Sequence, residues 1–312
     1  MNPLSAIFGA AVRARNDFYD RGTLRMRRLQ GPVVSIGNLS AGGAGKTPFL
    51  LLLGELLKQR SILFDVLSRG YKRDMKGVAL VDPSGNARQF GDEPLLIARK
   101  LGVPVVVGED RYAAGVYAEQ NFGVQLHLLD DGFQHRALAR EFDIVLLTPT
   151  DVRDSLLPTG RLREPLSALA RADVVVLSGN LSPESIPEFV KCTWRVQRSI
   201  FAPQIKDPCV AFCGIARPEL FFSQLAQAGL NLAATQPFRD HHAYDARDIQ
   251  KLLRLRDHHR ASLFVTTEKD AINLGEQLRA LGTVQVVPLR MELENADAAV
   301  NGLLARLSHR ER

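Results

Sequence analysis

A glycine-rich run that ends in lysine and threonine is the part of the sequence whose residue types point most directly to chemistry. Residues 42–47 read Gly-Gly-Ala-Gly-Lys-Thr, after a short β-branched segment at 33–36 and before a helical segment at 48–57. In this strand–loop–helix context, such a run forms a phosphate-binding loop whose backbone N–H groups surround the phosphates of a nucleotide. The residues predicted to form this loop are Ser40, Ala41, Gly42, Gly43, Ala44, Gly45, Lys46 and Thr47.

Individual positions of this loop narrow its interpretation. Lys46 is expected to contact the β- and γ-phosphates, and Thr47 to hold Mg²⁺. Ser40 stands six places before Lys46, where the strict P-loop pattern has glycine, so an ordinary Gly-rich turn is the alternative at this point. Ala41 stands where dimerising ATPases with a deviant loop carry a second lysine. This residue argues against an ATPase of the partitioning or arsenite-pump type.

An apolar segment that ends in two aspartates is the candidate second half of the site. Residues 126–129 read Leu-His-Leu-Leu and are followed by Asp130 and Asp131. Carboxylates in such a place are the usual protein ligands of a nucleotide's Mg²⁺. Taken alone the pattern also fits a turn, because turns often start with aspartate. We predict a Mg²⁺ site here and leave open which aspartate contacts the ion directly.

The segments that must position these residues alternate between strand and helix patterns. Strands are predicted at 33–36, 62–67, 104–107, 124–129, 142–147 and 174–177, and after residue 200 at 209–212, 262–266 and 284–287. Helices of the later series are predicted at 218–228 and 246–255. Such alternation is typical of a mostly parallel sheet covered by helices on both faces. The predicted fold class is therefore α/β, with a sheet of the P-loop NTPase type and a second, smaller Rossmann-like domain.

The predicted boundary between the two domains lies in residues 178–201. This stretch lacks clean periodicity and contains Pro183 and Pro187. We therefore expect an N-terminal segment at 1–28, a P-loop domain at 29–195 and a second α/β domain at 196–312.

The N-terminal segment combines an apolar helix face with a cluster of arginines. The apolar positions at helical spacing are Leu4, Ile7, Phe8, Ala11 and Val12. The arginines are Arg13, Arg15, Arg21, Arg25, Arg27 and Arg28. Such a helix suits the interface of an anionic membrane. A helix packed on its own domain, with a solvated basic face, is the alternative.

The composition excludes some classes of protein. The chain has 312 residues, 46% of them hydrophobic and 24% charged, which is typical of a globular protein. The net charge of +6 suggests an anionic partner: nucleotide, phospholipid or nucleic acid. We expect no nucleic-acid partner, because no basic and aromatic stacking platform is evident. Only three cysteines, no signal peptide and no run of about 20 apolar residues suggest a protein that stays inside the cell.

Several motifs, taken in order, resemble one protein family. They are Gly37-Asn38, the P-loop, Ser68-Arg69-Gly70-Tyr71, Gly91-Asp92-Glu93-Pro94, residues 130–135, residues 160–165, residues 212–218, Asp240-His241-His242 and residues 267–270. From about residue 16 to about residue 288 the chain resembles tetraacyldisaccharide 4′-kinase, the lipid A 4′-kinase of Gram-negative bacteria. The P-loop of that family also lacks the first glycine, so Ser40 fits it. Lys72 departs from the family, which usually has glycine there.

The resemblance implies an enzyme that uses ATP and Mg²⁺. It implies phosphorylation of the 4′-hydroxyl of tetraacyldisaccharide 1-phosphate, to give the lipid A precursor lipid IVA. It further implies a peripheral, monotopic protein at the cytoplasmic face of the bacterial inner membrane. The expected partners are the lipid-linked disaccharide and the anionic membrane surface, and the protein is expected to be a monomer. Two Rossmann-like domains hinged together would hold the active site in their cleft.

The resemblance also assigns catalytic residues. Asp92 would take the proton of the sugar hydroxyl, with Lys46 on the phosphates. The alternative for Asp92 is an N-cap of the helix that begins near Glu93. His241, from the second domain, would orient Asp92 and tune its pKa. His242 is the alternative partner.

Two neighbouring residues are assigned to the nucleotide and its metal ion in the same way. By resemblance, Glu164 helps to bind Mg²⁺ and Arg163 faces phosphate, where a guanidinium can clamp oxygens. A surface ion pair is the alternative. Arg69 and Tyr71 would meet either the nucleotide or the 1-phosphate of the acceptor.

Residues 267–270 bear on the choice of nucleotide. The run Thr-Glu-Lys-Asp lacks the spacing of a guanine-specificity motif, so ATP is the predicted donor. The run also fits a helix cap, with Thr267 first and Asp270 in the first turn. The alternative function for the whole chain is a P-loop ATPase that acts as a switch without a lipid acceptor.

Overall fold

Two β-sheets organise the chain, which the computed structural model describes over residues 2–179, 181–201 and 205–308. The larger sheet has nine strands in the order β13-β8-β7-β6-β1-β5-β2-β4-β3. Its strands are β1 (Val33–Asn38), β2 (Phe64–Ser68), β3 (Ala79–Leu80), β4 (Val105–Val107), β5 (Leu126–Asp130), β6 (Phe142–Leu147), β7 (Val174–Ser178), β8 (Thr193–Ile200) and β13 (Leu289–Leu293). All pairings from β8 to β4 are parallel, and only the two edge strands β13 and β3 pair antiparallel.

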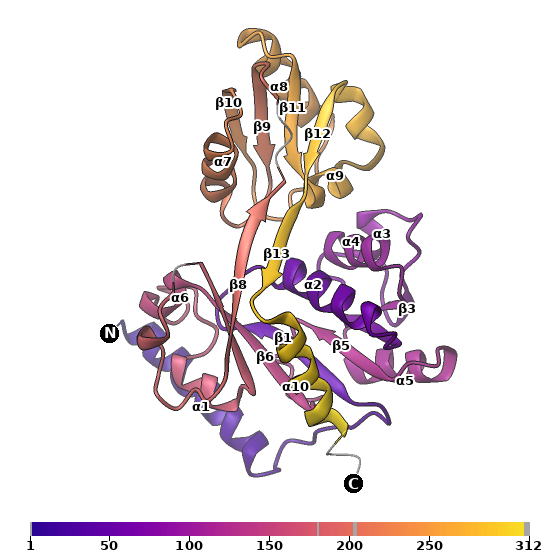
Figure 1. The fold of residues 1–312 in the computed structure, drawn as a ribbon, viewed down its shortest axis with the longest axis vertical. Coiled ribbons are helices and arrows are strands. Elements are labelled where there is room, and N and C mark those ends of the chain that lie inside the picture. Colours follow the sequence, from indigo (N-terminus) through magenta and orange to yellow (C-terminus); the bar gives the residue numbers. More distant parts are fainter. Residues whose placement is uncertain (1, 180, 202–204, 309–312) are drawn as a thin grey trace.

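The smaller sheet is wholly parallel and has the order β10-β9-β11-β12. Its strands are β9 (Cys209–Cys213), β10 (Leu232–Pro237), β11 (Leu263–Thr267) and β12 (Val284–Val287). Its α-helices are α7 (Pro218–Gln227), α8 (Ala246–His258) and α9 (Glu268–Leu274). In Figure 1 this sheet stands above the larger one, and β8 and β13 run between the two.

The remaining α-helices belong to the larger sheet. They are α1 (Pro3–Asp20), α2 (Lys46–Gln59), α3 (Ala87–Phe90), α4 (Asp92–Leu101), α5 (Arg111–Asn121), α6 (Pro149–Arg153) and α10 (Ala296–Ser308). Short 3₁₀ helices lie at Leu166–Arg171, Pro183–Ser185 and Gly275–Leu281. The central strands β1, β5 and β6 are buried along their whole length. Strands covered on both faces read as continuous apolar runs, which is why the sequence predicts them.

The predicted α/β class, with one large and one small sheet, is confirmed. The predicted strands of both series are present, but β3, β8, β10 and β13 are additional. Residues 289–308 were expected in the second domain. Instead, β13 pairs with β8 in the larger sheet, and α10 packs on α2 and β6. The apolar face of α10 accounts for this placement, because Val300 and Leu303 are buried in the same core as α2.

The N-terminal helix α1 packs on the molecule through its small residues. Ser5 Oγ lies 2.9 Å from the carbonyl oxygen of Leu156, and a Cβ added to Gly9 would lie 2.8 Å from the Leu156 side chain. The side chains of Leu4 and Ile7 are 60% and 68% exposed. The helix is therefore packed on its own domain, as one of the two interpretations expects. Much of its apolar face remains exposed, and contact with a membrane stays a prediction. Within the described ranges, no helix is long and apolar enough to cross a membrane.

The burial of α10 can be tested at Leu303, which is 1% exposed. Leu303→Ala should lower the free energy of unfolding by about 2–5 kcal/mol, because it removes packed methyl groups and leaves a cavity. Trp194, the single tryptophan, lies in β8 and stacks on Phe142, so its fluorescence reports on the larger sheet during denaturation. Asn301→Ala, at an exposed position of α10, is the matched control. Equal effects of the two substitutions would show that α10 is not part of this core.

Candidate active site

The glycine-rich loop takes a backbone conformation that requires glycine. It connects β1 to α2, and Gly42, Gly43 and Gly45 have φ values of 76°, 70° and 87°. At Gly45 an added Cβ would also lie 2.5 Å from the Met291 side chain. The loop therefore lies tightly against β13. It leads into the N-terminus of α2, where backbone N–H groups and the helix dipole favour an anion.

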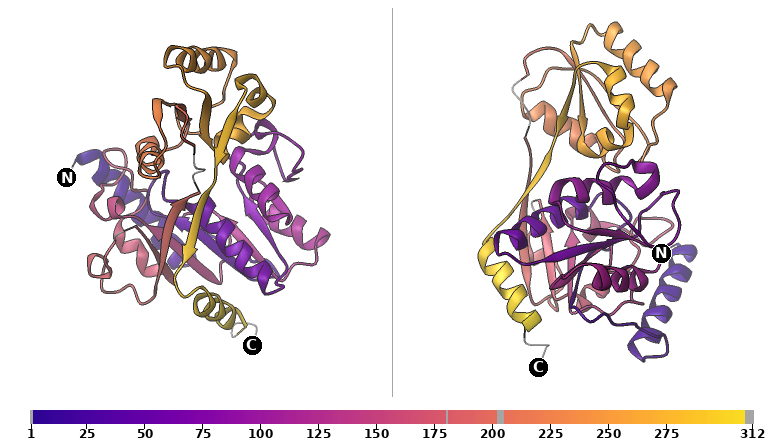
Figure 2. Two further views of the ribbon diagram at one scale, coloured as in Figure 1. Left: turned by 45° about the horizontal axis from the view of Figure 1, so that its top comes forward. Right: turned by 90° about the vertical axis from the view of Figure 1, so that its right-hand side faces the viewer.

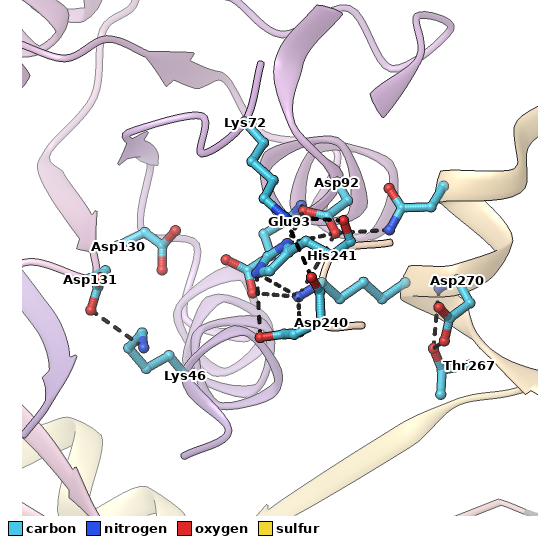
Figure 3. A network of polar contacts seen from close by, with 12 residues as sticks. Lys46, Lys72, Asp92, Glu93, Asp130, Asp131, Asp240, His241, Thr267 and Asp270 are labelled. Carbon is cyan, nitrogen blue, oxygen red and sulfur yellow. Dashed lines mark hydrogen bonds and ion pairs between the residues drawn. The ribbon is translucent and has the colours of Figure 1, made fainter. Parts of the chain in front are cut away.

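Lys46, the first residue of α2, lies beside an aspartate and an asparagine. Its Nζ donates to Asn38 Oδ1 at 2.9 Å. It also lies 3.4 Å from Asp131 Oδ1 (Figure 3). Arg163 donates to Asp131 at 2.8 and 2.9 Å and to Asn38 Oδ1 at 2.6 Å. Burial alone would raise the pKa of Asp131, but Lys46 and Arg163 outweigh it and hold that pKa well below its usual range. Asp131 is therefore ionised between two cations.

Asp130 ends β5 directly beside the strand that leads into the loop. The parallel pairing of β1 and β5 places Ile36 opposite Asp130, so both strands end at the same edge of the sheet. Ser68 donates a 2.8 Å hydrogen bond to its carboxylate. Burial, and then the charges of Glu93 and Asp131, raise the pKa of Asp130 to about 7. A nearby cation would stabilise the ionised form of this carboxylate.

These residue types fit a Mg²⁺ site. Thr47, Asp130 and Asp131 all line one cleft and supply only oxygen atoms. Among the described residues, no group of three or more His, Cys, Asp or Glu could hold a metal ion by itself. Mg²⁺ usually takes one or two protein carboxylates together with water and substrate phosphates.

Across the cleft, Asp92 of the first helical turn of α4 pairs with a histidine from the smaller sheet's side. His241, in the loop between β10 and α8, places Nδ1 2.9 and 3.0 Å from the two Asp92 oxygens (Figure 3). Asn273 donates to the same carboxylate at 3.0 Å. Burial would raise the pKa of Asp92, but the hydrogen bond from His241 and the charge of Lys269 lower it to about 2.

The alternatives for this pair do not fit the geometry. The N-cap of α4 is Gly91, and Asp92 lies within the helix, so the capping role considered for Asp92 is wrong. His242 is engaged elsewhere, because it stacks on Phe238 and its Nε2 lies 2.8 Å from Asp248.

One cleft of about 650 Å³ unites most of the predicted site residues. It is lined by residues 41–47 together with Asp92, Asp130, Asp131, Arg163 and His241. Arg69 and Tyr71 line it as well. The loop, the two aspartates and the Asp92–His241 pair therefore face a common volume.

Glu164 does not join this group in the described part of the chain. Its side chain is 2% exposed and forms an ion pair with Arg171 at 2.9 Å. Asn16 and Gln134 donate to the remaining positions of its carboxylate, at 2.7 and 3.1 Å. In this structure these donors surround the Glu164 carboxylate, and Arg163 pairs with Asp131 instead, so a role of Glu164 in binding Mg²⁺ stays a prediction.

Several residues at the site were not assigned from the sequence. Asn38 and Ser68 contact Lys46 and Asp130, and both stand in motifs quoted for the family resemblance. Lys72, which replaces a usual glycine, has a φ of 59°, and this left-handed conformation explains why glycine suits the position. A basic side chain there reaches the carbonyl oxygen of His241, 3.4 Å from its Nζ.

Residues 267–270 form the predicted helix cap. Thr267 is the N-cap of α9 and its Oγ1 accepts from the backbone N–H of Asp270 at 3.1 Å. Asp270 is buried and accepts from Gly214 N and the Tyr244 hydroxyl. The intervening Lys269 lines the cleft and lies 3.2 Å from Glu93 Oε1.

Comparisons with known proteins agree with the geometry. The family model described as tetraacyldisaccharide-1-P 4′-kinase matches residues 1–308. A protein of Koribacter versatilis named tetraacyldisaccharide 4′-kinase is 50% identical and covers 100% of both chains. One of the same name from Geobacter metallireducens is 37% identical over 93% of this chain and 92% of its own. A crystal structure of LpxK from Aquifex aeolicus, described as in complex with ATP, has a TM-score of 0.79 and 33% identity, covering 98% of this chain and 97% of that one. The chain therefore belongs to the tetraacyldisaccharide-1-P 4′-kinase family.

Proposed function

We propose that this protein transfers the γ-phosphoryl group of ATP to the 4′-hydroxyl of a tetraacylated glucosamine disaccharide 1-phosphate, which yields lipid IVA. The observation that carries the proposal is a P-loop that faces an Asp–His pair across one cleft, in a chain that matches the kinase family over its full length. A hydrolytic switch would not need that pair, so the ATPase alternative is not favoured.

ATP and Mg²⁺ are the proposed cofactors. The related LpxK from Aquifex aeolicus is described in complex with ATP, and the loop around Lys46 suits a triphosphate. Thr47, Asp130 and Asp131 would hold Mg²⁺, which when bound would neutralise charge on the phosphates. Lys46 and Arg163 would then stabilise the negative charge of the transferred group.

Asp92 is the proposed acceptor of the hydroxyl proton. With a pKa of about 2 it is ionised at neutral pH but is a weak base. A weak base suits a loose transition state, in which the hydroxyl gives up its proton late. Because Asp92 and His241 come from opposite sides of the cleft, the pair would be complete only when the cleft is closed.

The two sheets would then form two lobes with separate tasks. We propose a nucleotide lobe around the larger sheet and a smaller lobe that brings His241 to the acceptor. β8 and β13 would be the hinge between them. In both views of Figure 2 the long yellow strand spans the distance between the two sheets, which supports this division.

A peripheral position on the cytoplasmic face of the inner membrane is the proposed location. The exposed side chains of Leu4, Ile7 and Phe18 on α1 offer apolar surface for the interface of a bilayer. Arginines that follow the apolar face, such as Arg13 and Arg15, would favour anionic headgroups. Such a position would present the cleft to a lipid-anchored acceptor.

The first test is the reaction itself. The protein is incubated with γ-labelled ATP, Mg²⁺ and tetraacyldisaccharide 1-phosphate in detergent micelles, and the lipids are separated. Label should enter the lipid, and Lys46→Ala should reduce transfer at least about a hundredfold, because it removes a cation from the transferred phosphates. Arg254→Ala, on the exposed surface of α8, is the control. Labelled inorganic phosphate without labelled lipid would instead favour the hydrolytic switch.

If Asp92 is the proton acceptor, its substitution should change kcat but not the KM for ATP. Asp92→Asn keeps the size of the side chain but removes the proton acceptor, so kcat should fall by about 10²–10⁴-fold. The KM for ATP should change little, because Asp92 is not expected to contact the nucleotide. Steady-state rates at several ATP concentrations measure both. An unchanged kcat would exclude Asp92 as the base.

Membrane association can be tested on the exposed face of α1. The double variant Leu4→Glu/Ile7→Glu should weaken sedimentation with vesicles that contain anionic phospholipid, because it places two carboxylates in the apolar surface. A charge-matched control is Gln59→Glu/Asn301→Glu, at exposed positions of α2 and α10. Equal binding of the two variants would show that α1 is not the contact.

A further inference from the structure

Lys269 on α9 contacts the Asp92–His241 pair from the side of the smaller sheet. Its Nζ lies 3.1 Å from His241 Nε2 and 3.2 Å from Glu93 Oε1. The Asp92 and Asp240 carboxylates lie farther away, at 3.8 and 3.7 Å. The side chain is only 16% exposed. Figure 3 shows Asp92, Glu93 and Asp240 close to the imidazole of His241.

The charge of Lys269 follows from these neighbours. Burial would lower its pKa, but the charges of Glu93, Asp92 and Asp240 outweigh burial and raise it. The side chain is therefore an ammonium group. An ammonium group has three N–H donors and no acceptor.

This chemistry decides the tautomer of His241. Because Lys269 can only donate, His241 Nε2 must offer its lone pair and carries no proton. The ring proton of the neutral imidazole then lies on Nδ1, which is 2.9 Å from Asp92 Oδ2 and donates to it. The carboxylate of Asp92 keeps its negative charge, because the proton in this hydrogen bond belongs to the ring.

We propose that Lys269 is a positioning residue for phosphoryl transfer, because its bond to Nε2 fixes His241 as the neutral Nδ1–H tautomer and keeps Asp92 free to accept a proton. This inference rests on the roles proposed for Asp92 and His241. Lys269 would act through the imidazole of His241 and not on the reacting atoms.

The surroundings of His241 show what loss of Lys269 would cause. The groups that face the ring are Asp92 from α4, Asp240 beside it in the same loop, and the edge of Tyr71 at a centroid distance of 5.3 Å. Lys72 lies near only the backbone oxygen of His241. Without Lys269, carboxylates would dominate around Nε2 and favour a second proton on the ring. An imidazolium paired with Asp92 would make that carboxylate a poorer proton acceptor.

A simpler role for Lys269 is to hold the cleft closed, because its bond to Glu93 joins α9 to α4. The structure contains a matched control for that role. Lys100 of α4 and Glu268 of α9 form a second ion pair across the same contact. Lys100→Met would remove one bond between the same two helices without touching His241.

The kinetic test compares Lys269→Met with Lys100→Met from about pH 6 to pH 9, using the lipid phosphorylation assay. Lys269→Met should lower kcat about 10–100-fold near neutral pH and leave the KM for ATP little changed, because proton transfer and not binding is impaired. The deficit should shrink about tenfold or more toward pH 9, where the imidazole loses its second proton. Lys269→Arg, which keeps a cation, should recover part of the rate. Lys100→Met should show no such pH-dependent loss.

A second measurement reports the tautomer of His241 directly and does not depend on reaction rates. In protein labelled with ¹⁵N-histidine, nitrogen chemical shifts should report His241 as the neutral Nδ1–H tautomer at neutral pH, assigned by comparison with His241→Gln. Lys269→Met should convert this signal to the imidazolium or the other tautomer. Melting temperatures of all variants establish that they are folded.

Two results, one from the nitrogen chemical shifts and one from the kinetics, would overturn the proposal. A wild-type His241 that is an imidazolium or carries its proton on Nε2 at neutral pH would contradict the tautomer. Equal, pH-independent losses for Lys269→Met and Lys100→Met would leave only the closing role. Either result, with lipid phosphorylation by the wild-type protein intact, would refute the role of Lys269 alone. Absence of lipid phosphorylation by the wild-type protein would instead refute the proposed function.

Discussion

The hydrogen bond between His241 and Asp92 joins segments that belong to two separate sheets. For this bond to form, the chain must build both sheets and place them next to each other. The P-loop and the aspartates of β5 need only the larger sheet, because β1 and β5 are neighbours in it. The histidine needs a second scaffold. The chain therefore leaves the larger sheet through β8, builds the smaller sheet, and returns through β13 (Figure 1).

The three aspartates in the cleft differ in pKa, because each has different surroundings. Asp131 lies between Lys46 and Arg163 and is firmly ionised. Asp130 is buried and also lies near the charges of Glu93 and Asp131, so its pKa rises to about 7. Asp92 is ionised because His241, Lys269 and Asn273 surround it. In the proposed reaction, one of these carboxylates would hold the cation and another would accept the proton, which is the division that phosphoryl transfer needs.

The sequence predicts those parts of the fold and site that depend on local pattern. The parallel strands were found because both their faces are buried, and the Thr267 cap was found because its hydrogen bond spans three residues. β8 and β10 were missed because they are half exposed and mix polar with apolar residues. The C-terminal helix was assigned to the wrong sheet, since amphipathic pattern does not reveal which surface a helix covers.

The sequence also does not reveal the direction in which each side chain points in the folded protein. Arg163 and Glu164 are neighbours in the chain, yet Arg163 lines the cleft while Glu164 pairs with Arg171. Lys269 was not assigned at all, because its contacts with Glu93 and His241 depend on how two distant segments meet. Residues that act across the cleft are therefore the ones that composition and spacing reveal least.

The return of β13 and α10 to the larger sheet also governs the order in which the protein can fold during synthesis. The core around α2 includes Val300 and Leu303, so the nucleotide-binding half stays incomplete until nearly the whole chain has left the ribosome. The smaller sheet uses only residues 209–287 and can close before that. Contacts between such distant segments are slow to form. The nascent P-loop half therefore exposes part of its apolar core longer than the half that is made later.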